Sequence, residues 1–275
     1  MNCAARRTSS SNSRISHLIL PVARPNRGPA NTRPGSPGRP LSRCGNRVNA
    51  NQEIDASAPE ADCTLCPRLA TYRAANRAAN PEWFNGPVPS FGPRSASLLV
   101  VGMAPGVRGA NRTGRPFTGD HAGLLLYNTL IACGFATGVY GGDPSDGLEL
   151  HDCRIANAVR CVPPANLPEP IEVTTCNRFL RGELQMMPRL RAVLALGVLA
   201  HAAVLKACGM PVTRVRFRHG DIHTLPDGLL MADSYHVSRY NTNTGRLTEA
   251  MFSDVIATLA KRLRDTAAEA ISPAA

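Results

Sequence analysis

Four cysteines of the chain have the types and spacing of a metal site. Cys63 and Cys66 are separated by two residues, so their thiolates can converge on one metal. Cys161 lies far downstream in "NAVRCVPP", and Cys176 follows in "TTCNRFL". Four thiolates suit a structural zinc ion or a [4Fe–4S] cluster, and the spacing alone does not choose between them. Either site would link the N-terminal segment of the domain to the part of the domain that carries Cys161 and Cys176.

A glycine-rich segment offers a second kind of chemistry. It runs from Gly102 to Asp120 and reads "GMAPGVRGANRTGRPFTGD". A loop of this kind between a strand and a helix is typical of a phosphate-binding turn. Here the spacing is G-x-x-x-G-x-x-G rather than G-x-G-x-x-G, and neither the ribose-binding acid nor the P-loop lysine follows. These departures argue against a nucleotide- or dinucleotide-binding enzyme.

The elements that would position these residues alternate between strand and helix. Apolar runs predict strands near 97–104, 153–159, 191–197 and 229–235. Helices are expected near 65–79, 121–133, 172–187, 198–208 and 246–265. The alternation of apolar residues and arginines in 212–225 predicts an added edge strand or hairpin. We therefore expect an α/β fold, a three-layer α/β/α sandwich with a central, mainly parallel four-stranded sheet.

Charge divides the chain into a tail and a domain. Residues 1–52 contain nine arginines and no acid, whereas 22 basic residues face 20 acidic ones from residue 53 onward. Most of the net charge of +11 therefore lies in the tail, and any DNA-binding face of the domain must be local. We expect 1–52 to be disordered, 53–265 to form the domain and 266–275 to be a flexible C-terminus. A transit peptide and a misassigned start codon stay open as interpretations of the tail.

Two broad protein classes are not expected. No run approaches the roughly 18 apolar residues that a membrane-spanning helix needs. The nine cysteines are an odd number and no secretory signal precedes them, which argues against a disulfide scaffold. Cys133, Cys153 and Cys208 lie in apolar surroundings and are expected to be small buried residues.

Three motifs and the four cysteines together carry a family resemblance. The motifs are the glycine-rich loop, "IANAVRCVPP" and "YHVSRYNTNTGRLT". In this order they resemble family 5 of the uracil-DNA glycosylase superfamily, iron–sulfur glycosylases of broad specificity, over about residues 60–264. The resemblance implies a uracil-DNA glycosylase-like fold, a role in DNA base excision repair and a structural [4Fe–4S] cluster held by the four cysteines, with zinc as the fallback.

The resemblance also implies catalytic residues. Asp120 would orient a water molecule, accept its proton and offset positive charge on the sugar. On sequence alone an N-cap role for Asp120 is the better interpretation, and the two roles are compatible. His236 would donate a hydrogen bond to a base oxygen as negative charge builds there. Asn157 would contact the imide edge of uracil, where a strand-end asparagine is otherwise the common interpretation.

The remaining base contacts would come from the glycine-rich loop. Phe117 would stack on the flipped base, although a core aromatic is nearly as good an interpretation. Gly102 and Ala104 would let the backbone approach the base and its deoxyribose. Val107 and Arg108 stand where family 4 relatives carry an acid, and a pocket without that acid agrees with broad specificity.

The third motif is expected to face DNA. Its loop would enter the minor groove, with Tyr240 or Arg239 as the wedge that fills the space of the flipped base. Ser238, Asn243 and Arg246 would hold phosphates near a helix N-terminus. The alternative interpretation is a solvated polar turn followed by a capped helix.

These expectations describe a monofunctional hydrolase that leaves an abasic site, because no lysine stands in the motifs to form a Schiff base. Its substrates would be double- and single-stranded DNA containing uracil or deaminated bases such as hypoxanthine. We expect a monomer, cytoplasmic and nucleoid-associated in a prokaryote, with organelle targeting by the tail left open. The competing hypothesis is a non-catalytic iron–sulfur protein that binds nucleic acid, which leaves Asp120 and Asn157 without a role.

Overall fold

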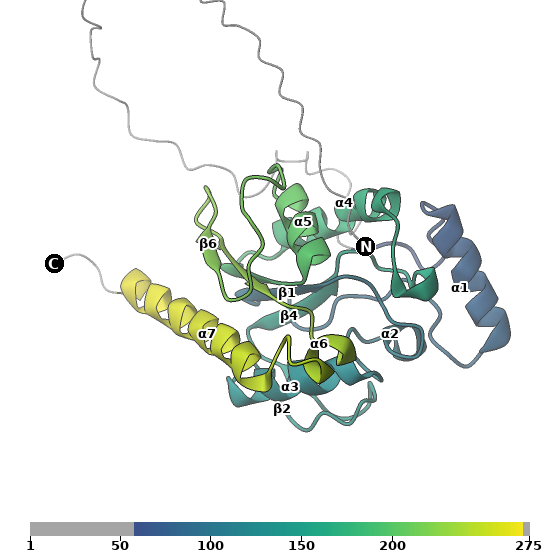
Figure 1. Cartoon of the computed structure of the whole chain (residues 1–275), viewed down its shortest axis with the longest axis horizontal. Helices are drawn as coiled ribbons and strands as arrows, with labels where there is room; N and C mark the ends of the chain where they lie inside the picture. Colours follow the sequence, from purple (N-terminus) through teal and green to yellow (C-terminus); the bar gives the residue numbers. More distant parts are fainter. Residues whose placement is uncertain (1–57, 272–275) are drawn as a thin grey trace, which may run out of the picture. The chain divides into compact units, whose positions relative to one another are not determined.

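The computed structural model describes residues 58–271 (Figure 1). The expected tail over 1–52 lies outside the described residues, as do residues 272–275. No helix in the described part of the chain is both long and apolar enough to cross a membrane.

A central sheet organises the described unit. Its strand order is β4-β1-β5-β7-β6, and the first four of these strands are parallel. The parallel strands are β1 (Leu98–Gly102), β4 (Cys153–Asn157), β5 (Ala192–Leu196) and β7 (Leu230–Ser234). Their residues are almost all buried, because helices cover both faces of the sheet. The predicted α/β/α sandwich with a mainly parallel sheet is confirmed.

The predicted count of four strands is wrong by one edge strand. β6 (Ile222–Thr224) pairs antiparallel with β7 and makes the sheet five-stranded. The edge strand expected within 212–225 is confirmed as β6, although Val215 and Phe217 lie before it. The Val215 carbonyl accepts a hydrogen bond from His201 Nε2 at 3.0 Å, and the Phe217 ring packs edge-on against His201. This stretch is therefore held by α5 rather than by the sheet.

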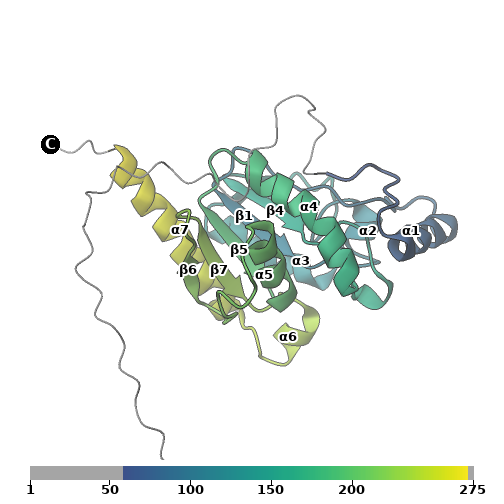
Figure 2. The same cartoon turned by 90° about the horizontal axis from the view of Figure 1, so that it is seen from above.

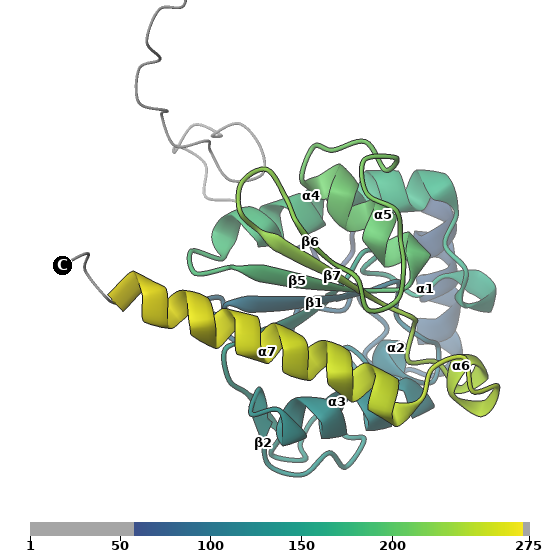
Figure 3. The same ribbon diagram turned by 60° about the vertical axis from the view of Figure 1, so that its left-hand side comes forward.

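Two pairs of helices form the outer layers, as Figures 2 and 3 show. α3 (His121–Ala132) and α7 (Glu249–Ile271) cover one face and share a core with the sheet residues Leu98, Val100 and Leu194. α4 (Pro170–Met186) and α5 (Val198–Ala207) cover the other face. α1 (Pro67–Ala79) contributes Leu69 to this second core.

The last helix runs past the predicted C-terminal boundary of the domain. We expected a flexible end from residue 266, but α7 continues to Ile271. The sequence there, "TAAEA", consists largely of strong helix formers, and the nearest downstream proline is at position 273. The helix therefore extends beyond the boundary at 265.

Short elements lie mostly in the loops around the sheet. α2 (Ala110–Thr113) lies inside the glycine-rich loop, and α6 (Arg239–Asn243) follows β7. β2 (Ala136–Thr137) and β3 (Glu149–Leu150) pair antiparallel in a small second sheet. A 3₁₀ turn, η1 (Pro164–Asn166), follows β4.

Candidate active site

The predicted polar residues gather where the parallel strands end. Asn157 is the last residue of β4 and pairs in register with Gly102, the last residue of β1. His236 follows β7, and Asp120 ends the loop that leaves β1. β4 pairs with one edge of β1 and the next strand of the sheet, β5, pairs with the other, so the strand order reverses at β1. In an open parallel sheet, ligands usually bind in the crevice at such a reversal.

A small cavity of about 40 Å³ brings these side chains together. Phe117, Asp120, Asn157 and His236 all line it, and Ala104 adds to its wall. Five residues with predicted roles in catalysis or base binding thus border one space. The sequence motifs from which they come are far apart along the chain, and the sheet connects them.

Asp120 is the N-cap of α3, as the simpler interpretation of the sequence predicted. Its side chain accepts a hydrogen bond from the Ala122 backbone N–H at 3.1 Å. The same carboxylate borders the small cavity, so the cap leaves it available to a ligand there. Although part of Asp120 faces solvent, protein atoms around the carboxyl group desolvate it and raise its pKa.

Two glycines make room for this carboxylate. A Cβ on Gly106 would lie 3.1 Å from Asp120 Oδ2, and a Cβ on Gly109 would overlap the same atom. The glycines of the loop therefore accommodate an acidic side chain at these two positions. This supports the sequence argument that the loop is not a cofactor phosphate cradle.

His236 is held by the loop that follows β7. Its backbone carbonyl accepts a hydrogen bond of 2.8 Å from Asn241 Nδ2, an α6 side chain. Burial lowers the pKa of His236, so the ring is neutral at neutral pH. A neutral imidazole still carries one N–H that can donate to a ligand in the cavity.

Phe117 and Asn157 complete the walls of the small cavity. Phe117 is 7% exposed and adopts a left-handed backbone conformation with φ of 52°. Among the described residues none forms a hydrogen bond with the Asn157 side-chain amide, which is 3% exposed. A Cβ on Gly102 would collide with the Phe117 ring and lie 2.5 Å from Asn157 Oδ1, so glycine is required at the end of β1. Gly102 itself lines neither cavity, but its lack of a side chain leaves room for Phe117 and Asn157, which line the small one.

A larger cavity of about 630 Å³ opens beside the small one. Ala104, Asp120 and His236 border both cavities. Of the predicted DNA-facing residues, those in its lining are Ser238, Arg239 and Arg246. Ser238 is also the N-cap of α6, where its Oγ accepts from the Asn241 N–H at 3.4 Å.

Tyr240 and Asn243 do not line either cavity. Tyr240 is 71% exposed at the start of α6, and Asn243 is exposed at its end. An exposed large aromatic ring beside the larger cavity has the exposure that a wedge residue needs.

The sequence analysis did not predict the role of several lining residues of the larger cavity, among them His121, Phe217 and Tyr235. His121 Nε2 lies 3.1 Å from Thr242 Oγ1, and the Arg246 guanidinium lies 4.6 Å from the centre of the Tyr235 ring. His121 and Tyr235 adjoin predicted site residues in the sequence, which was the available signal. Phe217 had none, because its segment was interpreted as an edge strand.

The four predicted ligand cysteines also converge. Cys63, Cys66, Cys161 and Cys176 line one small cavity between α1, α4 and the end of β4. Cys66 is the N-cap of α1, whereas Cys176 lies within α4 rather than at its start, because that helix begins earlier, at Pro170. In the part of the chain that the structure describes, no three His, Cys, Asp or Glu side chains are already gathered around a common metal position.

Polar contacts surround these sulfurs. Arg73 Nη1 donates to Cys161 Sγ at 3.2 Å, and the Arg160 backbone N–H donates to Cys176 Sγ at 3.3 Å. Burial raises the pKa of Cys161 to about 11 and that of Cys176 to about 12, so both are thiols without a bound cation. The donor set and its N–H contacts fit a thiolate-bound group, which would displace these protons.

The other three described cysteines differ in burial. Cys153 is fully buried in β4, as predicted. Cys133 and Cys208 end α3 and α5 and are only half-buried. None of them borders the cysteine-lined cavity.

Comparison with known proteins gives a consistent result. The profile of the Uracil DNA glycosylase superfamily matches residues 89–260. The chain is 44% identical over 207 residues to a protein named type-5 uracil-DNA glycosylase from Thermus thermophilus, covering 73% of this chain and 93% of that protein. Proteins of the same name from Pyrobaculum aerophilum and Mycobacterium leprae are 41% and 40% identical, covering 76% and 70% of this chain and 89% and 88% of their own lengths.

Proposed function

The chain belongs to the type-5 branch of the uracil DNA glycosylase superfamily, and on that premise we propose that it hydrolyses the N-glycosidic bond of uracil in DNA. The observation that carries the proposal is the convergence of Asp120, Asn157, His236 and Phe117 on one cavity. The non-catalytic alternative gives this convergence no function, and the matched relatives are named as glycosylases.

The reaction makes two electrostatic demands on the site. The target nucleotide leaves the duplex so that its C1′–N bond becomes accessible. As that bond breaks, the sugar gains positive charge and the base gains negative charge. A water molecule must then add to C1′ and lose a proton. The protein therefore needs an acceptor on the sugar side and a donor on the base side.

Asp120 serves the sugar side. Its Oδ1 is engaged by the α3 N-terminus at 3.1 Å, which fixes the orientation of the carboxylate toward the cavity. The carboxylate orients the water, accepts its proton and offsets the charge of the sugar. Its raised pKa makes it a stronger base than an ordinary aspartate.

The other side chains serve the base. The neutral His236 ring donates to a base oxygen as negative charge grows, and the Asn157 amide pairs with the imide edge. Phe117 stacks on the flipped ring. Ser238, Arg239, Asn243 and Arg246 contact the DNA backbone, and Tyr240 or Arg239 fills the vacated space. Substrates include hypoxanthine as well as uracil, in double- and single-stranded DNA, and the enzyme acts as a monomer.

We propose that Cys63, Cys66, Cys161 and Cys176 hold a [4Fe–4S] cluster. Four thiols around one cavity support this assignment, and zinc is the alternative with the same donors. The bound group would supply a structural link between α1 and α4, to which the 2.8 Å Arg68–Glu172 ion pair also contributes. Iron, inorganic sulfide and zinc measured per chain in anaerobically purified protein separate the two. Zinc without iron would contradict the cluster.

A base-release assay on a panel of oligonucleotides tests the activity. The panel carries uracil, hypoxanthine or only normal bases, in single strands and in matched or mismatched duplexes. We expect release of free uracil and an abasic strand that breaks only after alkali treatment. An intact glycosidic bond in every uracil substrate would refute the proposed function, and strand cleavage without alkali would refute its monofunctional character.

A further inference from the structure

The turn that carries Phe117 is in an unusual conformation. Phe117 has φ of 52° and Gly119 has φ of 87°, on either side of the fully buried Thr118. A left-handed conformation is disfavoured for a phenylalanine and persists only where surrounding contacts impose it. The contacts that impose it here determine where the ring of Phe117 and the following Asp120 point.

Tyr140 bridges this turn with a single hydroxyl group. Its O–H donates to the Phe117 carbonyl at 3.1 Å, and its oxygen accepts the Gly119 N–H at 3.3 Å. The Tyr140 ring stacks on Tyr127 of α3, with centroids 4.9 Å apart. Burial raises the pKa of Tyr140, so the hydroxyl keeps its proton at neutral pH. The carbonyl of Phe117 and the N–H of Gly119 are therefore both bound by one side chain from a distant loop.

The structure makes close room for this contact. A Cβ on Gly123 would overlap both the Phe117 carbonyl oxygen and the Tyr140 hydroxyl. Glycine in the first turn of α3 thus lets the helix, the turn and the tyrosine meet at one point. Neither Gly123 nor Tyr140 lines either active-site cavity.

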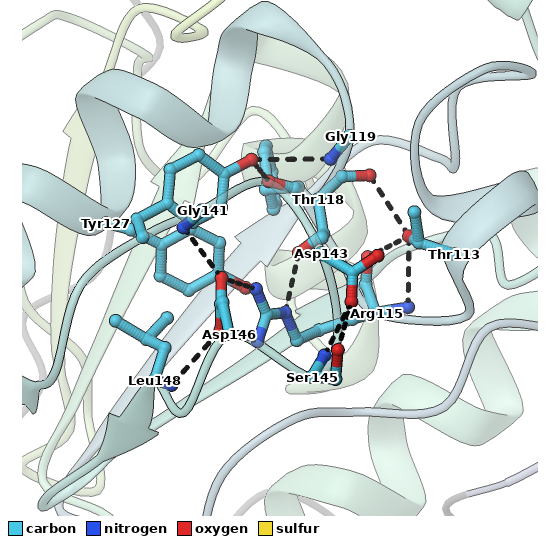
Figure 4. A network of polar contacts seen from close by, with 12 residues as sticks. Thr113, Arg115, Thr118, Gly119, Tyr127, Gly141, Asp143, Ser145, Asp146 and Leu148 are labelled. Carbon is cyan, nitrogen blue, oxygen red and sulfur yellow. Dashed lines mark hydrogen bonds and ion pairs between the residues drawn. The ribbon is translucent and has the colours of Figure 1, made fainter.

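A buried ion pair anchors the loop that carries Tyr140. Arg115 binds Asp146 through two hydrogen bonds of 2.8 and 2.7 Å, and each side chain is 5% exposed. Asp146 also accepts the N–H groups of Gly141 and Leu148, at 2.9 and 3.1 Å (Figure 4). On the other side, Arg115 Nε donates to Thr118 Oγ1 at 2.8 Å. The pair therefore joins the β2–β3 loop to the Phe117 turn.

We propose that Tyr140 is a positioning residue for base excision: its hydroxyl holds the Phe117–Gly119 turn so that the Phe117 ring is ready to stack on the flipped base. The inference rests on the proposed function, and Tyr140 itself touches neither the base nor the water. The Arg115–Asp146 pair keeps the loop of Tyr140 in reach of the turn.

Removal of the Tyr140 hydroxyl tests this inference. The Tyr140→Phe variant keeps the ring stacked on Tyr127 and loses both hydrogen bonds. We expect single-turnover uracil release to fall roughly ten- to a hundredfold, as for a small misplacement of a reacting group. The dissociation constant for duplex DNA that carries a stable abasic analogue should change less than about twofold. The pH dependence of the rate of uracil release should keep its shape. Tyr72→Phe on α1, outside both cavities, is the matched control and should retain full activity.

A double-mutant cycle asks whether the effect passes through Phe117. In a Phe117→Ala background, Tyr140→Phe should lower the rate by no more than about twofold, because the ring to be positioned is gone. The full loss in that background would overturn the inference. An unchanged rate of uracil release in the single Tyr140→Phe variant would overturn it as well.

Hydrogen exchange gives a readout that does not depend on activity. The peptide over 113–120 should exchange about two- to tenfold faster in Tyr140→Phe, as expected for lost hydrogen bonds, with the rest of the described domain unchanged. Unchanged exchange would show that the hydroxyl does not hold the turn. If the wild-type protein released no base, the proposed function would be wrong. The hydrogen-exchange rates would still show whether the Tyr140 hydroxyl holds this turn.

Discussion

The rings of Phe117 and His236 lie with their centroids 6.0 Å apart and tilted by 34° to each other. Phe117 comes from the loop after β1, and His236 follows β7, so two strands separated by β5 bring them together. Both rings border the small cavity. An apolar face and a hydrogen-bond donor thus stand side by side where a flipped base is proposed to bind.

Replacement of Asp120 by asparagine should remove most of the catalytic rate. Asparagine can still accept the Ala122 N–H but cannot take a proton from water, so we expect roughly 10²- to 10⁴-fold slower uracil release. The exposed Asp254 of α7 offers a control, and Asp254→Asn should be fully active. Single-turnover base release measures both. A wild-type rate in Asp120→Asn would exclude Asp120 as the base.

The pH profile should show the raised pKa of Asp120. The carboxylate is the active form, so the rate falls as the pH is lowered through the pKa of this group. Because desolvation raises that pKa, the fall should begin at a higher pH than the value of about 4 for an ordinary aspartate would give. Rates measured across acidic pH in wild type and Asp120→Asn check this. An acidic limb that persists in the variant belongs to another group.

His236 should act in its neutral form. Burial lowers its pKa, so raising the pH from about 7 to 9 should not reduce the rate through loss of a histidine proton. His236→Ala should slow base release roughly 10²-fold, whereas His151→Ala, an exposed histidine beside β3, should not. An alkaline limb near neutrality that disappears in His236→Ala would instead indicate a cationic His236.

The DNA-facing loop should separate duplex from single-stranded substrates. Tyr240→Ala should weaken binding to uracil-containing duplex more than to single strand, because only the duplex has a vacated stack to fill. Arg246→Gln should reduce the salt dependence of binding by about one phosphate contact. Arg189→Gln, before β5 and at the opposite end of the sheet from the cavities, is the control. If Arg246→Gln and Arg189→Gln reduced the salt dependence of DNA binding equally, a phosphate contact at Arg246 would be contradicted.

The Arg115–Asp146 pair should stabilise the fold in a pH-dependent way. The Arg115 hydrogen bonds hold the pKa of Asp146 well below its ordinary value. The ion pair contributes fully to the free energy of unfolding above about pH 3.9, the pKa of Asp146 in the unfolded chain. That contribution is lost as the pH falls toward the lower pKa of Asp146 in the folded protein. Asp146→Asn should therefore reduce the free energy of unfolding by about 3 kcal/mol at pH 7. Urea denaturation at pH 7 and below pH 4 should show this difference shrinking in acid.

Much of the fold and of the candidate site was predictable from local patterns. The apolar runs predicted the four parallel strands, since a strand covered on both faces has to be apolar throughout. The glycine-rich loop, Asn157 and His236 lie at strand ends, and parallel strands bring their carboxyl ends to one edge. The motif order then indicated the family. The exact residues of β6 within 212–225 and the length of α7 were missed, because pairing partners and terminal helix propensity leave weak signals.

The sequence by itself determined which residues carry chemistry, because acids, thiols, amides and imidazoles are set by residue type. The tertiary structure decided how they are supported. That the Asp120 carboxylate needs Gly106 and Gly109, and that Tyr140 holds the Phe117 turn from across the β2–β3 loop, depends on contacts between segments distant along the chain. Such contacts form only when the sheet and α3 pack, so no pattern of neighbouring residues encodes them.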